Sequence, residues 1–268
     1  MIRNAAVAGQ FYPAWPDELR ETIRYFSPED VTRANAIGAV CPHAGYVYSG
    51  PVAGAVISRI KLTDTVIILG PNHRGIGKPF SIMKEGSWKT PLGEVKVDTE
   101  LAQAILKASS QIEEDSLAHR YEHSLEVQVP FLQYFKPDVQ IVPIVLSLAN
   151  PEVYREIGRA IATAQKATGI DALILASSDM THYEPHESAK TKDKQAIEAI
   201  LDLDADQLIK RIAKYDISMC GYAPVVALIT AAVELGAGKT ELVKYQTSGD
   251  TSGDFSSVVG YAGIIIWK

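Results

Sequence analysis

Short runs of apolar residues recur along the chain, each bounded by Gly, Pro, Asn, Asp or Ser. Continuous apolar runs of this length are typical of strands that are buried on both faces of a sheet. The runs that predict the main strands are 36–41, 65–69, 139–146, 172–176 and 258–267. Two smaller runs, 80–83 and 93–97, flank the segment 88–91 and predict a hairpin, which would make the sheet mixed.

Helical patterns lie between these runs. Asp98 and Asn150 are good N-caps for the segments that follow them, and Pro51 and Pro151 stand at favourable first helical positions. Pro130 is expected to kink or break the helix in which it lies. Strands that alternate with helices predict an α/β protein with a mostly parallel sheet. The predicted helices are 17–26, 51–60, 99–109, 123–135, 151–168, 188–201, 204–214 and 224–235.

Composition narrows the class of protein. Of the 268 residues, 47% are hydrophobic and 22% are charged, so the chain is neither disordered nor a disulfide scaffold. No Pro-, Gly- or Ser-rich linker divides it, which predicts one domain over residues 1–268. The net charge of −6 argues against a nucleic-acid partner and against an anionic membrane. Without a leader-like or membrane-spanning run, we expect a cytoplasmic protein with reduced thiols.

Chemistry-bearing side chains follow three of the predicted strands, at the points where the strands end. His43 follows run 36–41, His73 follows run 65–69, and Asp179 and His182 follow run 172–176. Ligands of open α/β sheets bind at the carboxyl ends of the strands, so these groups are expected in one crevice. A single histidine in a loop is more often a surface or hydrogen-bonding residue. Their recurrence at successive strand ends favours a metal or acid/base site.

The two cysteines differ in their surroundings. Cys41 lies inside an apolar run and is expected to be a small buried hydrophobic residue. Cys220 lies just before the predicted helix 224–235, where the positive end of the helix dipole favours a thiolate. Thiolate and neutral imidazole are good ligands for iron, copper or zinc, which makes Cys220 a candidate ligand.

The remaining histidines are less informative. On a helix, His123 and Glu126 would lie one turn apart on one face, as a substrate-binding or supporting pair. The alternative is an ion pair or cap at the start of that helix. His119 and His186 stand in polar segments and are expected to be exposed to solvent.

The chain resembles the Memo family (mediator of ErbB2-driven motility) over essentially its whole length. Seven matches in the same order carry the resemblance and are more specific together than any one alone. They are Ala8-Gly-Gln-Phe-Tyr-Pro13, Pro42-His-Ala-Gly-Tyr46, Gly70-Pro-Asn-His73, Trp88-Lys-Thr-Pro-Leu-Gly93, Glu122-His-Ser-Leu-Glu-Val-Gln128, Ser177-Ser-Asp-Met-Thr-His-Tyr183 and Cys220-Gly-Tyr-Ala-Pro224.

The family is structurally similar to class III extradiol dioxygenases, which cleave catechol-type rings with non-haem Fe(II). This similarity implies a three-layer α/β/α sandwich with a central mixed sheet. It also implies a metal site of His43, His73 and Cys220, with Fe(II) or Cu as the cofactor and Zn as an alternative. The cysteine stands where the dioxygenases have a carboxylate, so ring cleavage does not follow from the fold.

The resemblance also suggests roles for the other residues. His182 matches the acid/base histidine of the dioxygenases, with Asp179 beside it to orient His182 or the substrate. His123 and Tyr46 are expected to contact the substrate.

Three functions are compatible with these residues. The first is a metal-dependent oxidoreductase, in which His182 shuttles a proton. The second is a non-catalytic module that binds a peptide or a small molecule in the same pocket. The third is the handling of iron or copper. Prokaryotic genes of the family often accompany AMMECR-type and radical-SAM proteins, which are therefore expected pathway partners. The chain itself has no CxxxCxxC cluster motif.

Overall fold

Parallel strands form the centre of a twelve-stranded mixed sheet in the computed structural model, which describes residues 1–268. The central strands are β8 (Gln140–Leu146), β3 (Thr65–Pro71), β9 (Ala172–Ser177) and β2 (Ala36–Cys41), in that spatial order. Every residue of β3 and β9 is buried, which explains their unbroken apolar sequences. The predicted strands agree with these four to within two residues at each end.

The C-terminal strand β12 (Val258–Trp267) extends this sheet beyond β2, to which it is antiparallel. It also pairs with β11 (Lys239–Thr247) and with the short β10 (His182–Glu184). The predicted strand 258–267 is confirmed. The sequence did not predict β11, because its residues are mostly polar and half-buried and form no apolar run.

Short strands complete the opposite side of the sheet. β6 (Gly93–Val97) runs parallel to β8 and antiparallel to β5 (Ser87–Thr90), which pairs with β1 (Ile2–Arg3). The strand β4 (Phe80–Ile82) pairs with β8 and with β7 (Glu113–Glu114). The predicted hairpin of 80–83 with 93–97 is therefore wrong. The segment expected to be its turn contains β5, which takes the place beside β6.

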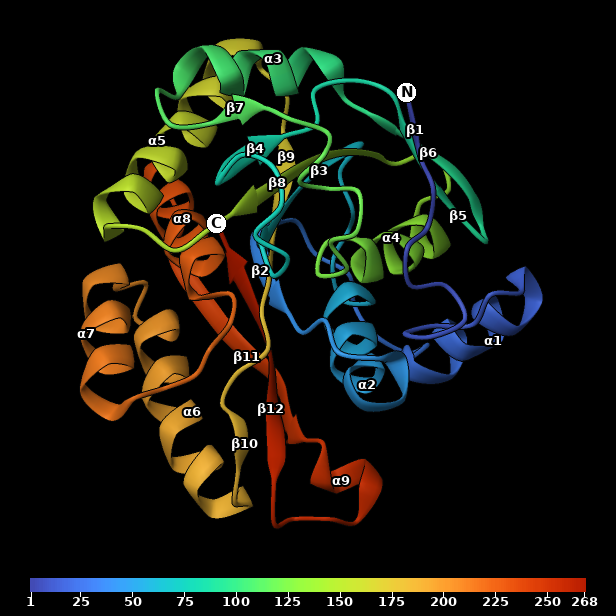
Figure 1. Ribbon diagram of the computed structural model, residues 1–268, viewed down its shortest axis with the longest axis vertical. Helices are drawn as coiled ribbons and strands as arrows, with labels where there is room; N and C mark the ends of the chain where they lie inside the picture. The colour runs from blue at the N-terminus through green and yellow to red at the C-terminus, as the bar shows by residue number, and fades with distance from the viewer.

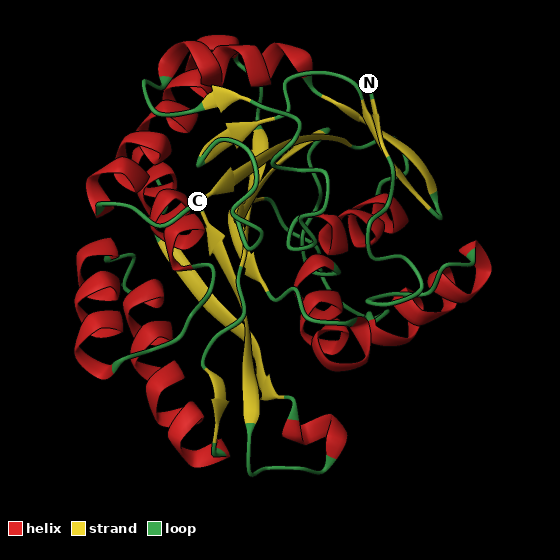
Figure 2. Ribbon diagram, in the orientation of Figure 1, coloured by secondary structure: helices red, strands yellow, loops and turns green.

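Helices cover both faces of the sheet (Figures 1 and 2). One layer contains α3 (Thr99–Ala108), α5 (Pro151–Thr168) and α8 (Tyr222–Glu234). The other contains α1 (Pro16–Phe26), α2 (Tyr46–Ile57) and α4 (Val129–Phe135). Two further helices, α6 (His186–Leu201) and α7 (Ala205–Tyr215), pack beside α8 and β12, and α9 (Gly249–Ser252) caps the hairpin of β11 and β12. The predicted three-layer α/β/α sandwich is confirmed.

Two predicted helices differ from the structure. The helix expected from Pro51 begins at Tyr46, with the Tyr46 backbone N–H donating to the Phe11 carbonyl at 2.7 Å, and it contains Pro51 in its interior. The helix expected over 123–135 is a 3₁₀ turn, η1 (Glu126–Gln128), followed by α4. Pro130 lies in the first turn of α4, where a missing N–H costs nothing. The caps Asp98 and Asn150 are confirmed, because each side chain accepts a backbone N–H of its helix.

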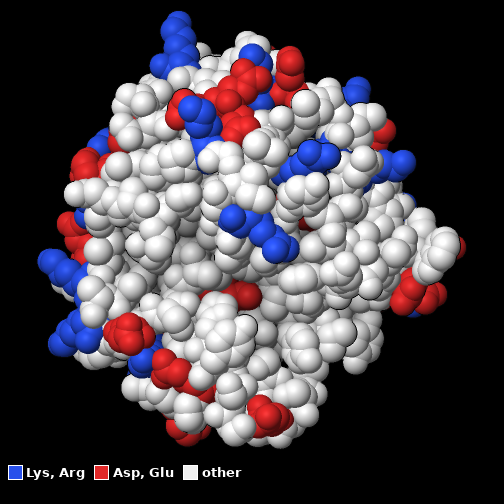
Figure 3. Space-filling view, viewed as in Figure 1, with Lys and Arg blue, Asp and Glu red and all other residues white.

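Charged side chains of both signs are interspersed over the face shown in Figure 3. None of the helices combines the length and the apolar character needed to cross a lipid bilayer. Both cysteines are free, and Cys41 is fully buried in β2 as expected.

Candidate metal centre

Three histidines from separate loops converge at one edge of the sheet. His43 and His73 follow β2 and β3, which are parallel and separated only by β9. His123 comes from the loop that precedes η1. The candidate ligand atoms of the three side chains all lie within 4.8 Å of one another. The His73 and His123 rings are stacked with centroids 4.7 Å apart, and the His43 ring meets both edge-on. This spacing is suited to a single metal ion.

A buried carboxylate, Glu122, holds His73 in place. Its Oε1 lies 2.9 Å from His73 Nδ1, and its Oε2 accepts the His73 backbone N–H at 2.8 Å. Oε1 also accepts the Ser124 backbone N–H and lies 3.5 Å from His123 Nδ1. Because Nδ1 of His73 donates to the carboxylate, Nε2 keeps its lone pair for a metal. Burial raises the pKa of Glu122, but the hydrogen bond and charge of His73 and the other donors outweigh it and lower the pKa to about 2.

The hydrogen bonds of Ser177 fix the tautomer of His43. The Ser177 hydroxyl donates its one proton to the Ser124 carbonyl and accepts from the Gln128 side chain. His43 Nδ1, 3.0 Å from the same oxygen, must therefore be the donor of that contact. The lone pair of His43 is thus on Nε2. His43 and His73 share this arrangement, in which a protein partner holds Nδ1 and Nε2 is left for a ligand.

Burial keeps two imidazoles of the cluster neutral. It lowers the pKa of His43 well below its ordinary value, and the neighbouring His73, His123 and His182 lower it further. Burial also lowers the pKa of His123 to about 4, against the opposing charge of Glu122. A metal ligand must present an unprotonated nitrogen, so both side chains are ready to bind at neutral pH.

Cys220 lies against the same cluster. Its Sγ is 3.2 Å from His43 Nε2 and accepts the Asp179 backbone N–H at 3.3 Å. The sequence suggested that the N-terminus of α8 would favour the thiolate. That expectation is wrong as long as no metal ion is bound. Burial and the charge of Asp179 raise the pKa of the Cys220 thiol, so the protein's own groups favour the protonated form. A cation bound beside Cys220 would lower the pKa of the thiol again.

The residues after β9 support the cluster from the side. Asp179 Oδ1 accepts the His43 backbone N–H at 2.7 Å. Burial raises the pKa of Asp179 to about 6, in spite of that hydrogen bond and the charge of His182. The His182 Nδ1 donates to the Ser218 carbonyl at 2.9 Å, which leaves its Nε2 as a free acceptor. Asp179 thus contacts the backbone of a cluster residue, whereas the hydrogen bonds of His182 are to Ser218.

Tyr46 packs against Tyr12 and Phe131. Its side chain is buried, and its hydroxyl donates to the Val127 carbonyl at 2.6 Å. The sequence predicts that Tyr46 contacts the substrate, but its hydroxyl proton is already donated to the Val127 backbone.

The expected pair of His123 and Glu126 does not exist. Glu126 accepts the backbone N–H groups of Ala6 and Val7 and the Tyr12 hydroxyl, and it forms an ion pair with Arg3. The pairing was inferred from helical spacing, but residues 123–125 precede η1. The carboxylate that supports the cluster is Glu122, which directly precedes His123 and which the helical pattern did not single out.

The two peripheral histidines are also more enclosed than expected. His119 is fully buried beside Trp88, and burial lowers its pKa to about 3. His186 is partly buried, with Nδ1 3.0 Å from Thr247 Oγ1. Neither belongs to the cluster.

Comparison with known proteins identifies the family. The model of the Memo-like protein family matches residues 3–265. A MEMO1 family protein of Methanosarcina barkeri is 46% identical over 99% of this chain and 100% of its own length. A MEMO1 family protein of Desulfurococcus amylolyticus is also 46% identical, over 98% of both chains. A crystal structure of an uncharacterized protein of Escherichia coli K12 shares the fold, with a TM-score of 0.59 and 14% identity over 85% of this chain and 98% of that chain. The chain belongs to the Memo family.

Proposed function

We propose that this protein binds one Fe(II) or copper ion at His43 and His73 and acts there as an oxidoreductase. The observation that supports this most strongly is the fixed orientation of the two imidazoles. Glu122 and Ser177 hold the two Nδ1 atoms, so both Nε2 lone pairs are available to one ion. Imidazole is a good ligand for iron, copper and zinc, and zinc is the alternative ion.

The third ligand is Cys220 or His123. The Cys220 sulfur lies 3.2 Å from His43 Nε2, and a thiolate would favour copper or shift the redox behaviour of iron. The His123 ring is stacked on His73 and has a lowered pKa. We favour Cys220, because it directly contacts the ligand atom of His43 and because the resemblance to the dioxygenases implies a ligand at this position. His123 then lies where it can contact a bound substrate.

The protein side chains supply positioning and proton transfer. A bound iron or copper ion would supply one-electron chemistry and a place for a small ligand. Asp179 holds the His43 loop through the backbone N–H. The His182 ring is held by the Ser218 carbonyl, which leaves its Nε2 free to accept a proton from a bound substrate. Cleavage of an aromatic ring is not part of the proposal.

Metal analysis tests the site. The protein is purified without oxygen, loaded with Fe(II), Cu(I) or Zn(II), desalted and analysed for bound metal. We expect the wild type to retain a stoichiometric amount, His73→Ala to lose most of it, and the matched control His186→Ala to retain it. Equal metal contents in all three proteins would contradict the site. Cys220→Ser and His123→Asn then distinguish the third ligand, and loss of a sulfur-to-copper absorption band only in Cys220→Ser would assign it to the thiolate.

A metal-handling role is the second candidate, because the site is open to solvent. The side chain of His73 is 29% exposed, so an ion bound there could exchange. Rapid transfer of the ion to an external chelator, without turnover of any oxidisable substrate, would favour handling over catalysis.

A further inference from the structure

A cavity of about 360 Å³ lies beside His73 and Cys220, between the loops that follow β3 and β8 and the start of α8. We propose that this cavity binds an uncharged small molecule with an apolar body and one polar end directed at the histidine cluster. The inference deepens the proposed function, because it assigns a class of substrate to the same site. Its volume is near the lower limit of about 300 to 1,000 Å³ that is usual for small-molecule sites.

The walls of the cavity carry no charged Asp, Glu, Lys or Arg side chain. Apolar side chains form most of its surface, and a charged ligand placed there would lose its hydration without gaining an ionic partner. The carboxylates nearby are used elsewhere, since Glu122 binds His73 and Asp179 binds the His43 loop. Arg74 follows His73 in the chain but does not line the cavity. The lining residues are Pro71, Asn72, His73, Leu146, Ser147, Leu148, Ile217, Ser218, Met219, Cys220, Tyr222 and Ala223.

Two polar side chains of the cavity wall, His73 and Cys220, connect it to the histidine cluster, and Asn72, Ser147, Ser218 and Tyr222 are the other polar residues of the wall. His73 and Cys220 belong to the cluster or contact it, and Ser218 holds His182 through its carbonyl and its hydroxyl. Leu146, Ile217 and Met219 are buried apolar side chains of the same cavity. A ligand that directs a polar group at His73 and Cys220 and covers these apolar side chains with its remainder matches the lining.

Leu148 is the residue that we expect to determine specificity. It lines the cavity, yet 75% of it is exposed, so most of its apolar surface is left for a ligand to cover. Its loop is held by Tyr154, whose hydroxyl donates to the Ala149 carbonyl at 3.0 Å and accepts the Ala149 backbone N–H. Leu148 is therefore presented from a fixed backbone. Each methylene that a ligand buries is worth roughly a fourfold gain in affinity.

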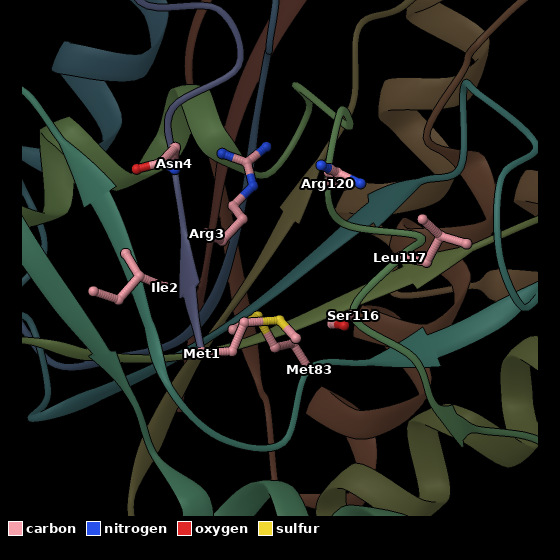
Figure 4. Close-up of a pocket in the computed structure, with 8 residues that line it drawn as sticks. All are labelled: Met1, Ile2, Arg3, Asn4, Met83, Ser116, Leu117 and Arg120. Atoms are coloured by element: carbon pink, nitrogen blue, oxygen red, sulfur yellow. The ribbon is translucent and has the colours of Figure 1, made fainter.

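A second cavity, of about 400 Å³, has a different character (Figure 4). It lies at the start of the chain and is lined by Arg3 and Arg120 together with Met1, Met83 and Leu117. Arg3 is already paired with Glu126. None of the cluster histidines lines this cavity, which makes it a useful internal control.

The four methionines provide a direct measurement. Met219 lines the proposed cavity, Met1 and Met83 line the second one, and Met180 is buried in the core. Protein labelled with ¹³C in the methionine methyl groups is titrated with 1-hexanol and with hexanoate, which have the same chain length but differ in charge. Two samples are compared, one treated with EDTA and one loaded with Zn(II). Methionine-to-leucine variants assign the signals.

We expect 1-hexanol to shift the Met219 signal saturably in both samples and to leave the Met1 and Met83 signals in place. To the EDTA-treated protein, hexanoate should bind at least about fivefold more weakly than 1-hexanol. Leu148→Ser should weaken hexanol binding by about threefold or more, whereas Leu117→Ser, the matched change at the second cavity, should have no effect. Any one of three results would overturn the inference. They are an unchanged Met219 signal, binding of hexanoate to the EDTA-treated protein as tight as that of 1-hexanol, and equal effects of Leu148→Ser and Leu117→Ser. Because the EDTA-treated sample needs no metal, failure to retain zinc would count against the proposed function alone.

Discussion

Among single residues, Glu122 has the greatest influence on the candidate site. It is fully buried, it accepts both the side-chain and the backbone N–H of His73, and it lies 3.5 Å from His123. A carboxylate in this position selects the tautomer of a ligating histidine and increases its basicity. Its importance was not visible in the sequence, because the residue it supports is 49 positions away along the chain. His43 and His73 were identifiable, since the carboxyl ends of parallel strands meet at one edge.

We therefore predict that Glu122→Gln lowers metal affinity by about 10- to 100-fold. The amide keeps the shape of the side chain but removes the negative charge and can present N–H groups to His73. Competition with a chelator of known affinity measures the change. Glu241→Gln, which alters a half-exposed ion pair with Arg59, is the control and should retain wild-type affinity. An unaltered affinity in Glu122→Gln would show that His73 is positioned without it.

Among the elements, helix α2 is packed unusually close to the end of α1. A Cβ atom added at Gly54 would lie 2.4 Å from the Phe26 carbonyl oxygen, and one added at Gly50 would meet the Phe26 ring. The loop that carries His43 leads directly into α2, so this packing also positions the site. The sequence predicted a helix here but placed its start at Pro51, because a proline at a first helical position is a strong local signal. The close contact between α2 and α1 is a tertiary contact, so it produces no periodic pattern in the sequence from which it could be predicted.

We predict that Gly54→Ala destabilises the protein by about 1 to 3 kcal/mol, because backbone atoms of Phe26 cannot move aside as a flexible side chain would. Alanine stabilises a helix interior by about 1 kcal/mol relative to glycine. A net loss of stability in Gly54→Ala must therefore come from the steric clash. Urea denaturation measures it. Gly238→Ala, outside any helix, is the control for an added methyl group, since a Cβ there meets nothing within 4 Å. If the two variants were equally stable, the spacing of α1 and α2 would not depend on Gly54.

For the whole molecule, the buried His119 makes the free energy of unfolding depend on pH. Burial lowers the pKa of His119 to about 3, below the value of about 6.5 expected in the unfolded chain, and the charge of Arg3 acts in the same direction. The folded state must therefore exclude a proton that the unfolded chain takes up. Stability from this residue is present above about pH 6.5 and is lost as the pH falls from there toward 3.

We predict that His119→Leu removes this contribution. Between pH 7.5 and pH 5 the free energy of unfolding should fall by about 2 kcal/mol less in the variant than in the wild type, at roughly 1.4 kcal/mol per pH unit below 6.5. Urea denaturation at the two pH values gives the difference, and His186→Leu serves as the control at a partly buried histidine. Parallel losses in wild type and His119→Leu would show that other groups cause the acid sensitivity.

The position of β12 between β2 and the outer strands has a consequence for synthesis of the chain on the ribosome. β2 pairs with β9 on one side and with the C-terminal strand on the other. Until residues 258–267 have left the ribosome, β2 is an unpaired edge strand, and the His43 loop follows a strand of an incomplete sheet. The strand that carries the His43 loop is therefore synthesised early, but it gains its second neighbour only when β12 pairs with it. If the proposed metal site exists, we expect it to bind its ion only after β12 has paired with β2.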